Sequence, residues 1–191
     1  MAQHGGGSTA EARLLEQARA GDRHAFATLV HDAAPALERL ATRMLGHRHD
    51  AEDATQEAVL YAWRRLESFR GDARFSTWLH RILVSRSLDA LRRRRDVEPI
   101  PADVPASVAA PESVVEGRDL EPAVRDAIDD LPPVQGVTLL LRVDHGLPYG
   151  EIAYVLGTTR NAVRVNLIAA RKRLALRLRG TVDLGDPEAA S

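Results

Sequence analysis

Apolar residues recur at helical spacing in two parts of the chain, residues 9–95 and residues 119–180. The stretch between them, residues 96–118, holds four prolines and no sustained apolar period, which is typical of a linker. Residues 1–8 and 181–191 are expected to be disordered ends. The pattern therefore predicts an all-α protein of two small helical domains joined by a flexible, acidic, proline-containing linker.

Capping and turn residues delimit the first helices of the first domain. Ser8 and Glu11 form a capping box for a short helix, which Gly21 ends. Asp22 can cap a longer helix, which Pro35 either kinks or restarts. Tryptophans can stack on unpaired bases, but at helical spacing among Leu and Ile we favour a core position. The expected core is Phe26, Leu29, Val30, Leu37, Leu40, Leu45, Val59, Trp63 and Trp78.

A helix is expected to start at Asp50, with Asp53 completing a capping-box-like pair and Glu52 adding charge that the helix dipole favours. Its two sides differ in polarity. The apolar side holds Ala51, Ala54, Ala58, Val59, Ala62 and Leu66. The opposite side holds Glu52, Asp53, Gln56, Glu57, Leu60 and Arg64. This acidic side is left for solvent or for a basic partner.

A turn-rich loop, residues 69–75, precedes a helix that Ser76 can cap and that runs to Arg95. Phe69 and Phe75 can reach outward from the loop to contact bases or can pack inward, and the sequence leaves both open. Apolar residues cover most of the helix: Leu79, Ile82, Leu83, Val84, Leu88, Ala90 and Leu91. A single polar stripe is left: Arg81, Ser85, Asp89 and Arg92. The four arginines at 92–95 suit a phosphate backbone.

The second domain carries a helix-turn-helix pattern. Residues 120–130 form a helix, and Pro132 or Pro133 opens another that Gly146 ends. Residues 149–156, Gly157, and a segment from Thr158 or Thr159 to residue 179 then give helix, tight turn and helix. The last helix has an inner apolar face of Val163, Leu167, Ala170 and Leu174.

The outward face of that last helix can enter a major groove, although the same face could be merely a solvated surface. Arg164 could bond guanine edges or phosphates, and Asn161 could read adenine. Val165 or Ile168 could touch a thymine methyl group, whereas Arg171 and Lys172 suit phosphate contacts. The groove-binding interpretation is favoured because residues 160–179 hold seven basic residues and no acidic one.

Composition adds limits to this picture. The net charge of −1 gives no indication of nucleic-acid binding. The distribution of charge does, because acids outnumber bases ten to two between Asp96 and Asp130 while the charged residues of the segment 160–179 are all basic. The chain has no cysteine, which excludes disulfides and thiolate metal sites and fits a reducing cytoplasm. No apolar run approaches membrane-spanning length, and the start lacks a signal-peptide pattern. We therefore expect a cytoplasmic protein without membrane insertion.

A metal site could be imagined at His47, His49, Asp50 and Asp53, but capping already explains the acids. No cofactor is expected. No nucleophile elbow, phosphate loop or triad arrangement occurs, so the chain is not expected to be an enzyme.

Several runs in order resemble one family. Residues 50–83, DAEDATQEAVLYAWRRLESFRGDARFSTWLHRIL, and residues 88–95, LDALRRRR, are similar to the promoter-recognition domain of bacterial RNA polymerase sigma factors of the extracytoplasmic-function (ECF) group. The match continues at Leu131-Pro-Pro, at Glu151-Ile-Ala and through Ala170-Arg-Lys-Arg-Leu. Residues 9–95 would then be sigma region 2 and residues 119–180 sigma region 4.

The resemblance implies a factor that binds core RNA polymerase, recognises and helps open double-stranded promoter DNA, contacts its locally melted strands, and has an anti-sigma factor as a further partner. Polymerase binding would use Glu52, Asp53, Gln56, Glu57 and Leu60. The downstream promoter element would contact Phe69, Arg70, Arg74, Phe75, Arg81, Ser85, Arg92 and Arg93. The upstream element would contact Arg160, Asn161, Arg164, Val165, Ile168, Arg171 and Lys172. The linker would be a plain tether or would thread toward the polymerase channel.

Some positions depart from the family pattern. Ser85 stands where an asparagine is expected, and Pro148 where a capping serine is usual. Residues 162–167 read Ala-Val-Arg-Val-Asn-Leu instead of Thr-Val-Lys-Ser-Arg-Leu, and Ala169 replaces a common arginine. We therefore expect an atypical upstream element. Two rival functions stay open: a stand-alone helix-turn-helix regulator, and a metal-dependent hydrolase built around His47 and His49.

Overall fold

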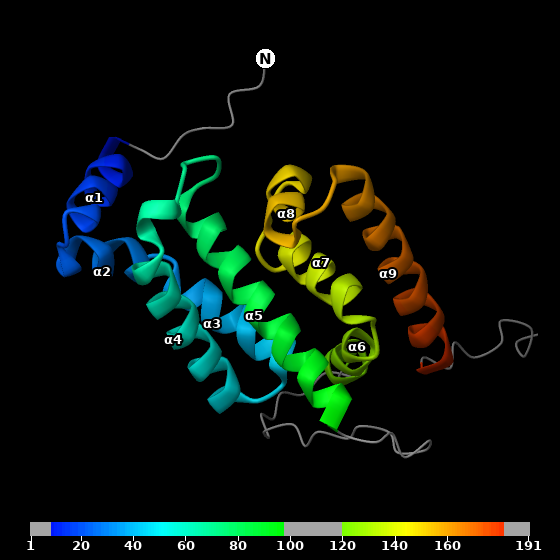
Figure 1. Ribbon diagram of the computed structural model, residues 1–191. Helices are drawn as coiled ribbons and strands as arrows, with labels where there is room; N and C mark the ends of the chain where they lie inside the picture. Colours follow the sequence, from blue (N-terminus) through cyan, green and yellow to red (C-terminus); the bar gives the residue numbers. More distant parts are fainter. Residues whose placement is uncertain (1–8, 98–119, 182–191) are drawn as a thin grey trace, which may run out of the picture.

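The computed structural model describes residues 9–97 and 120–181, and these two ranges are all-α (Figure 1). The first half contains α1 (Thr9–Arg19), α2 (Arg23–His31), α3 (Ala34–Leu45), α4 (Arg48–Arg64), a 3-10 turn η1 (Leu66–Ser68) and α5 (Phe75–Val97). The second half contains α6 (Leu120–Asp129), α7 (Pro133–Val143), α8 (Tyr149–Leu156) and α9 (Arg160–Thr181). The all-α prediction is confirmed. The expectations for Ser8, for nearly all of the linker and for both chain ends lie outside the described residues.

The boundary between α2 and its neighbours follows the sequence closely. The Asp22 carboxylate accepts hydrogen bonds from the backbone N–H groups of His24, at 2.8 Å, and Ala25, at 3.1 Å, so the predicted cap is confirmed. Pro35 lies in the first turn of α3, where its missing N–H costs nothing. Pro35 therefore restarts a helix and does not kink one.

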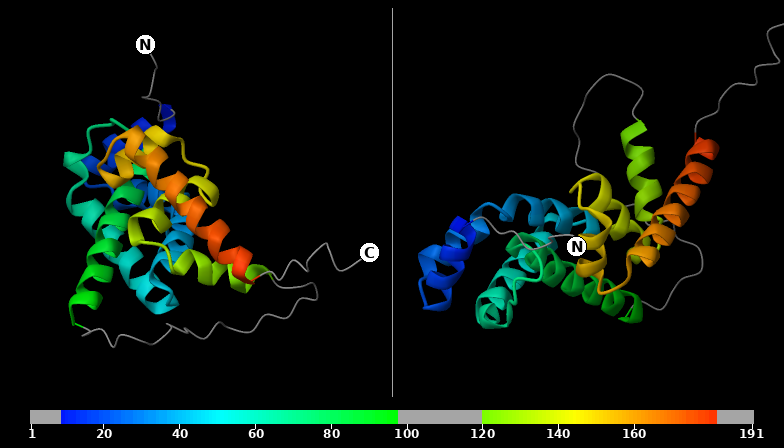
Figure 2. Two further views of the ribbon diagram at one scale, coloured as in Figure 1. Left: turned by 90° about the vertical axis from the view of Figure 1, so that its right-hand side faces the viewer. Right: turned by 90° about the horizontal axis from the view of Figure 1, so that it is seen from above.

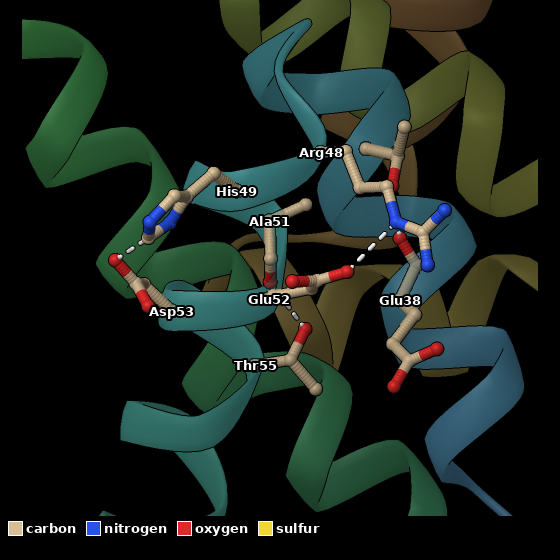
Figure 3. A network of polar contacts seen from close by, with 8 residues as sticks. Glu38, Arg48, His49, Ala51, Glu52, Asp53 and Thr55 are labelled. Carbon is tan, nitrogen blue, oxygen red and sulfur yellow. Dashed lines mark hydrogen bonds and ion pairs between the residues drawn. The ribbon is translucent and has the colours of Figure 1, made fainter.

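The expected start of α4 is wrong. The helix begins at Arg48, and Asp50 lies inside its first turn, where the positive end of the helix dipole stabilises a carboxylate. Two pairs one turn apart explain the earlier start: Arg48 Nε lies 2.8 Å from a Glu52 oxygen, and His49 Nδ1 lies 3.3 Å from a carboxylate oxygen of Asp53 (Figure 3). Asp53 thus pairs with a side chain and completes no capping box.

The cap of α5 also differs from expectation. Ser76 lies within the helix, which begins at Phe75, and its carbonyl accepts a hydrogen bond from His80. The acceptor at the helix start comes from a distant element, because the backbone N–H of Phe75 donates to Glu11 Oε1 of α1 at 3.1 Å. A partner 64 residues away thus satisfies one of the free backbone N–H groups at this helix start, and the expected serine cap is wrong.

The predicted core of the first half is confirmed. Leu37, Leu40 and Leu79 are fully buried, and the ring of Phe26 meets that of Trp63 edge-on with 5.0 Å between centroids. Trp78 is buried beside Phe69, with 5.1 Å between centroids. Both tryptophans therefore contribute to the core, as favoured.

The helix-turn-helix of the second half is confirmed. Gly157 adopts a left-handed φ of 62° between α8 and α9, which a residue with a Cβ adopts only at a cost. The hydroxyl of Thr159 accepts from the backbone N–H of Ala162 at 3.2 Å, so Thr159 caps the recognition helix. Helix α7 ends earlier than expected, at Val143, and Gly146 turns the chain toward α8 with a φ of 62°.

The two halves pack directly on each other. Helix α5 lies against α8, and α3 lies against α7. Figure 2 shows α6–α9 gathered on one side of the first half. One continuous hydrophobic cluster includes buried residues of both halves, from Leu37 and Leu83 to Ile152 and Leu167. The two units predicted from sequence are thus in contact in this arrangement.

Candidate protein and nucleic-acid interfaces

The acidic face of α4 is exposed as the helical period predicted. Ala51, Ala58 and Ala62 are buried on the opposite side. The exposed residues of this face are Glu52, Asp53, Gln56, Glu57 and Leu60, and Leu60 is 55% exposed. Leu60 and the carboxylates around it give this face both an apolar and a charged group that a partner can contact.

Tyr61 of α4 and Arg86 of α5 also belong to this acidic face, and sequence reasoning missed both. The Arg86 guanidinium lies 3.6 Å from a Glu57 oxygen and stacks on the Tyr61 ring, 4.4 Å from its centroid. Tyr61 lies four residues after Glu57, so its place on the face could have been read from the helical period. The place of Arg86 could not, because it depends on how α5 packs on α4.

The polar stripe of α5 is exposed as predicted, at Arg81, Ser85, Asp89 and Arg92. Arg92 Nη1 lies 3.2 Å from a carboxylate oxygen of Asp89, and Arg93 beside it is exposed. Arg81 has a partner in the second half of the chain, because its guanidinium lies 4.9 Å from the centroid of the Tyr154 ring of α8. Cationic groups along one exposed helix stripe can contact a phosphate backbone.

The outward orientation considered for Phe69 and Phe75 is wrong. Their side chains are 3% and 2% exposed, and their rings meet edge-on with 5.8 Å between centroids. Burying both rings in the core removes far more apolar surface from water than an exposed loop position would. Neither ring presents a free face on which a base could stack. Arg70 and Arg74 of the same loop are exposed.

The recognition helix α9 divides as expected. Val163, Leu167 and Ala170 are fully buried or nearly so. The exposed residues are Arg160, Asn161, Arg164, Val165, Ile168, Arg171 and Lys172. Val165 and Ile168 are 53% and 59% exposed, which is unusual for branched apolar side chains. An exposed helix with basic and apolar groups on one face can contact both phosphates and base edges.

Two contacts orient the arginines of this helix. Arg164 Nη2 donates a hydrogen bond to Asn161 Oδ1 at 3.0 Å, so the two candidate base-reading side chains lie side by side. Arg160 lies over Gly150 of α8, where a Cβ would stand 3.0 Å from Arg160 Nη2. Pro148, at the start of α8, makes no side-chain capping bond.

The histidines considered for metal binding, His47 and His49, are both exposed near the start of α4. Figure 3 shows His49 beside Asp53. A backbone hydrogen bond and the nearby Asp53 carboxylate raise the pKa of His49 above its ordinary value. Within residues 9–97 and 120–181, no group of three or more His, Asp or Glu side chains is placed to hold a metal ion. Within the same ranges, no helix is long and apolar enough to cross a membrane.

Comparison with known proteins identifies both halves. The family description Sigma-70 region 2 matches residues 29–97, and the description Sigma-70, region 4 matches residues 122–174. The chain is 37% identical to the ECF RNA polymerase sigma factor SigM of Mycobacterium tuberculosis (strain H37Rv), over 92% of this chain and 87% of that protein. It is 36% identical to the ECF RNA polymerase sigma factor SigE of Mycolicibacterium smegmatis, over 76% of this chain and 58% of that protein.

A solved structure supports the same conclusion. The sigma factor RpoE of Bartonella quintana, in a co-crystal with the anti-sigma factor NepR, superposes with a TM-score of 0.67. That superposition covers 81% of this chain and 96% of RpoE at 25% sequence identity. A helical first half with an acidic exposed face, a helix-turn-helix second half and matches over both halves lead to one conclusion. The chain belongs to the extracytoplasmic-function sigma factors of bacterial RNA polymerase, and its function is promoter-specific initiation of transcription with the core enzyme.

Proposed function

We propose that the acidic face of α4 binds core RNA polymerase. The observation that carries this proposal is the exposed cluster of carboxylates around Leu60, an arrangement that combines charge complementarity with an apolar anchor. The extension formed by Arg86 and Tyr61 belongs to the same surface, because Arg86 contacts Glu57 directly. A basic or mixed-charge helical surface is the complementary partner.

Two further surfaces bind promoter DNA in this proposal. The downstream element contacts Arg70, Arg74, Arg81, Ser85, Arg92 and Arg93, without the two buried phenylalanines. The upstream element contacts the exposed face of α9, with Arg164 and Asn161 reading bases and Arg171 and Lys172 holding phosphates. The protein acts by binding alone, performs no catalysis itself and works in the cytoplasm. An anti-sigma factor, the kind of partner that NepR is for RpoE, is a further expected partner.

Run-off transcription with core polymerase on the promoter of the protein's own gene tests this function. We expect transcripts that start at one position and that depend on both the core enzyme and this protein. A stand-alone helix-turn-helix regulator would instead bind the promoter tightly without polymerase and give no dependent transcript. That outcome would reject the assignment to initiation.

Reversing the charge of Asp53 and Glu57 together is expected to weaken polymerase binding by roughly tenfold or more, since like charges would then face each other across the interface. Stability should change little, because both side chains are exposed. Affinity for the core enzyme is measured by fluorescence anisotropy. The matched control reverses Glu16 and Glu67, two exposed acids outside this face. Equal affinities of the two double variants would place the interface elsewhere.

Replacing Arg70 and Arg74 with alanine is expected to weaken binding to forked downstream promoter DNA. Each lost phosphate contact should also flatten the logarithmic salt dependence by about 0.7 for single-stranded DNA. Permanganate reactivity of unpaired thymines measures opening in the polymerase complex, which should be slower. A variant that opens the promoter at the wild-type rate, with an unchanged salt slope, would remove both arginines from the DNA surface.

A further inference from the structure

Helix α8 packs against α5, the helix that carries part of the proposed downstream DNA surface (Figure 1). The hydroxyl of Thr77 donates to Glu151 Oε2 of α8 at 2.7 Å. One turn further along α5, the Arg81 guanidinium stacks on the Tyr154 ring at 4.9 Å. Arg81 therefore has a partner from the chain itself at a position proposed to contact DNA.

Two imidazoles meet at this contact. His80 of α5 is 5% exposed, and its ring centroid lies 5.2 Å from that of His145, in the turn before α8, with the rings edge to face. His80 Nδ1 lies 2.7 Å from the carbonyl oxygen of Ser76, which can only accept, so Nδ1 carries the proton. In the neutral ring Nε2 is therefore the acceptor, and it has no hydrogen-bond partner among the described residues.

Their surroundings favour the neutral form of both imidazoles while the halves are packed. Burial lowers the pKa of His80, and the Ser76 carbonyl and the Glu151 carboxylate oppose this only in part. The pKa of His145 is lowered to about 4, mainly by burial and next by the neighbouring His80. The Asp144 carboxylate raises this pKa and the Arg39 guanidinium lowers it further. Arg43 lies 3.6 Å from Asp144 and so offsets the carboxylate nearest to His145.

We propose that α8 competes with promoter DNA for the side of α5 that carries Arg81, and that acidification releases α8 through His80 and His145. The competition between α8 and DNA rests on the proposed function, because it requires α5 to bind DNA. The release of α8 on acidification does not, since it concerns only the contact between the two halves of the chain. The partner in this contact is the second half of the same chain.

The direction of the pH effect follows from the two states. Separated halves expose both imidazoles to water, where each titrates near its ordinary pKa of 6.5. Above that pH both states are neutral and the contact is unaffected. Below it, the separated state takes up protons more readily than the packed state, because burial in the packed state lowers the pKa of His80 and lowers that of His145 to about 4. At pH about 5.5 the ratio of packed to separated molecules should fall roughly threefold to tenfold, the lower figure allowing for solvent screening at half-buried His145.

The full chain permits a direct test because it has no cysteine of its own. Cysteines introduced at two exposed alanines, Ala27 of α2 and Ala175 of α9, can carry a donor and an acceptor dye. Energy transfer is measured from pH about 7.5 to about 5.5, with the helical circular dichroism signal recorded at each point. We expect transfer to fall on acidification while the helical signal stays constant.

Variants distinguish a release of α8 that depends on His80 and His145 from a general sensitivity of the protein to acid. The double variant His80→Gln and His145→Gln should show pH-independent transfer, whereas His31→Gln, at an exposed histidine of α2, should respond like the wild type. If the double variant folds poorly, Tyr154→Ala provides a second test by lowering transfer already at pH about 7.5. Transfer that is pH-independent in the wild type, or equally pH-dependent in the double variant, overturns the release.

Binding of forked downstream DNA tests the competition separately. Tyr154→Ala should bind this DNA severalfold more tightly than the wild type at pH about 7.5, because Arg81 is then freed. Lower transfer with unchanged DNA affinity overturns the competition even if the halves separate. Failure of the proposed DNA surface itself would appear elsewhere, as unchanged binding on replacing Arg70 and Arg74.

Discussion

Replacing Phe75 with alanine is expected to lower the free energy of unfolding by about 3 to 5 kcal/mol, the usual cost of removing a buried phenyl ring. The ring is 2% exposed and touches three other aromatic rings, with centroids 6.0 Å from Phe26, 5.8 Å from Phe69 and 5.8 Å from Trp78. Its removal loses these contacts and leaves a cavity that the neighbouring helices can fill only in part.

Urea unfolding followed by circular dichroism and by tryptophan fluorescence measures this loss. Arg74→Ala, at the exposed neighbouring position, is the matched control and should change stability by about 0.5 kcal/mol or less. A Phe75→Ala protein that keeps its stability but opens promoters slowly would show that the ring leaves the core to meet a base. The buried cluster makes the opposite result the expected one.

Replacing Arg164 with alanine is expected to relax the preference at one upstream promoter position by about 1 to 3 kcal/mol, the discrimination that a bidentate arginine typically gives. Arg164 is exposed near the start of α9, and its contact with Asn161 holds the guanidinium beside a second group able to read a base. Lys172→Ala, near the middle of the same helix, should instead weaken all sequences alike and reduce the logarithmic salt slope by about 0.9.

Selection from DNA randomised in the upstream element distinguishes the two roles. Because Val165 and Ile168 are exposed and apolar, the selected motif should contain fewer polar contacts than is usual in the family and should favour thymine methyl groups. If Arg164→Ala leaves the motif unchanged and lowers affinity for every sequence, Arg164 is a phosphate contact.

The sequence predicts well those features that depend on one helix at a time. The exposed faces of α4, α5 and α9 follow from the helical period, and Asp22, Pro133, Gly157 and Thr159 mark boundaries through local backbone chemistry. Matched runs in both halves then identify the family. Each of these features depends on residues within a few turns of one another.

Features that depend on partners far along the chain could not be predicted. Helix α4 starts before Asp50 because Arg48 pairs with Glu52 and His49 pairs with Asp53. The sequence alone is equally compatible with a capping role and with a pairing role for these acids. The inward position of Phe75 depends on where α2 places Phe26, and Phe69 in turn packs on Phe75 and Trp78. The contact between α5 and α8 joins residues on both sides of a segment that reads as a linker.

Helix α1 holds the loop between η1 and α5 in place. Arg19 of this helix donates a hydrogen bond to the carbonyl oxygen of Phe69, and Glu11 accepts one from the backbone N–H of Phe75. The helix therefore contacts both ends of the loop that carries Arg70 and Arg74. Helix α1 lies before residue 29, where the match to Sigma-70 region 2 begins. A fragment that begins at residue 29 would keep every residue of this half that is proposed to contact polymerase or DNA. It would lose the hydrogen bonds that Arg19 and Glu11 make to the two ends of the loop. The segment that holds this loop in place is therefore longer than the segment that matches the family, and it includes the residues of α1 from Thr9 onward.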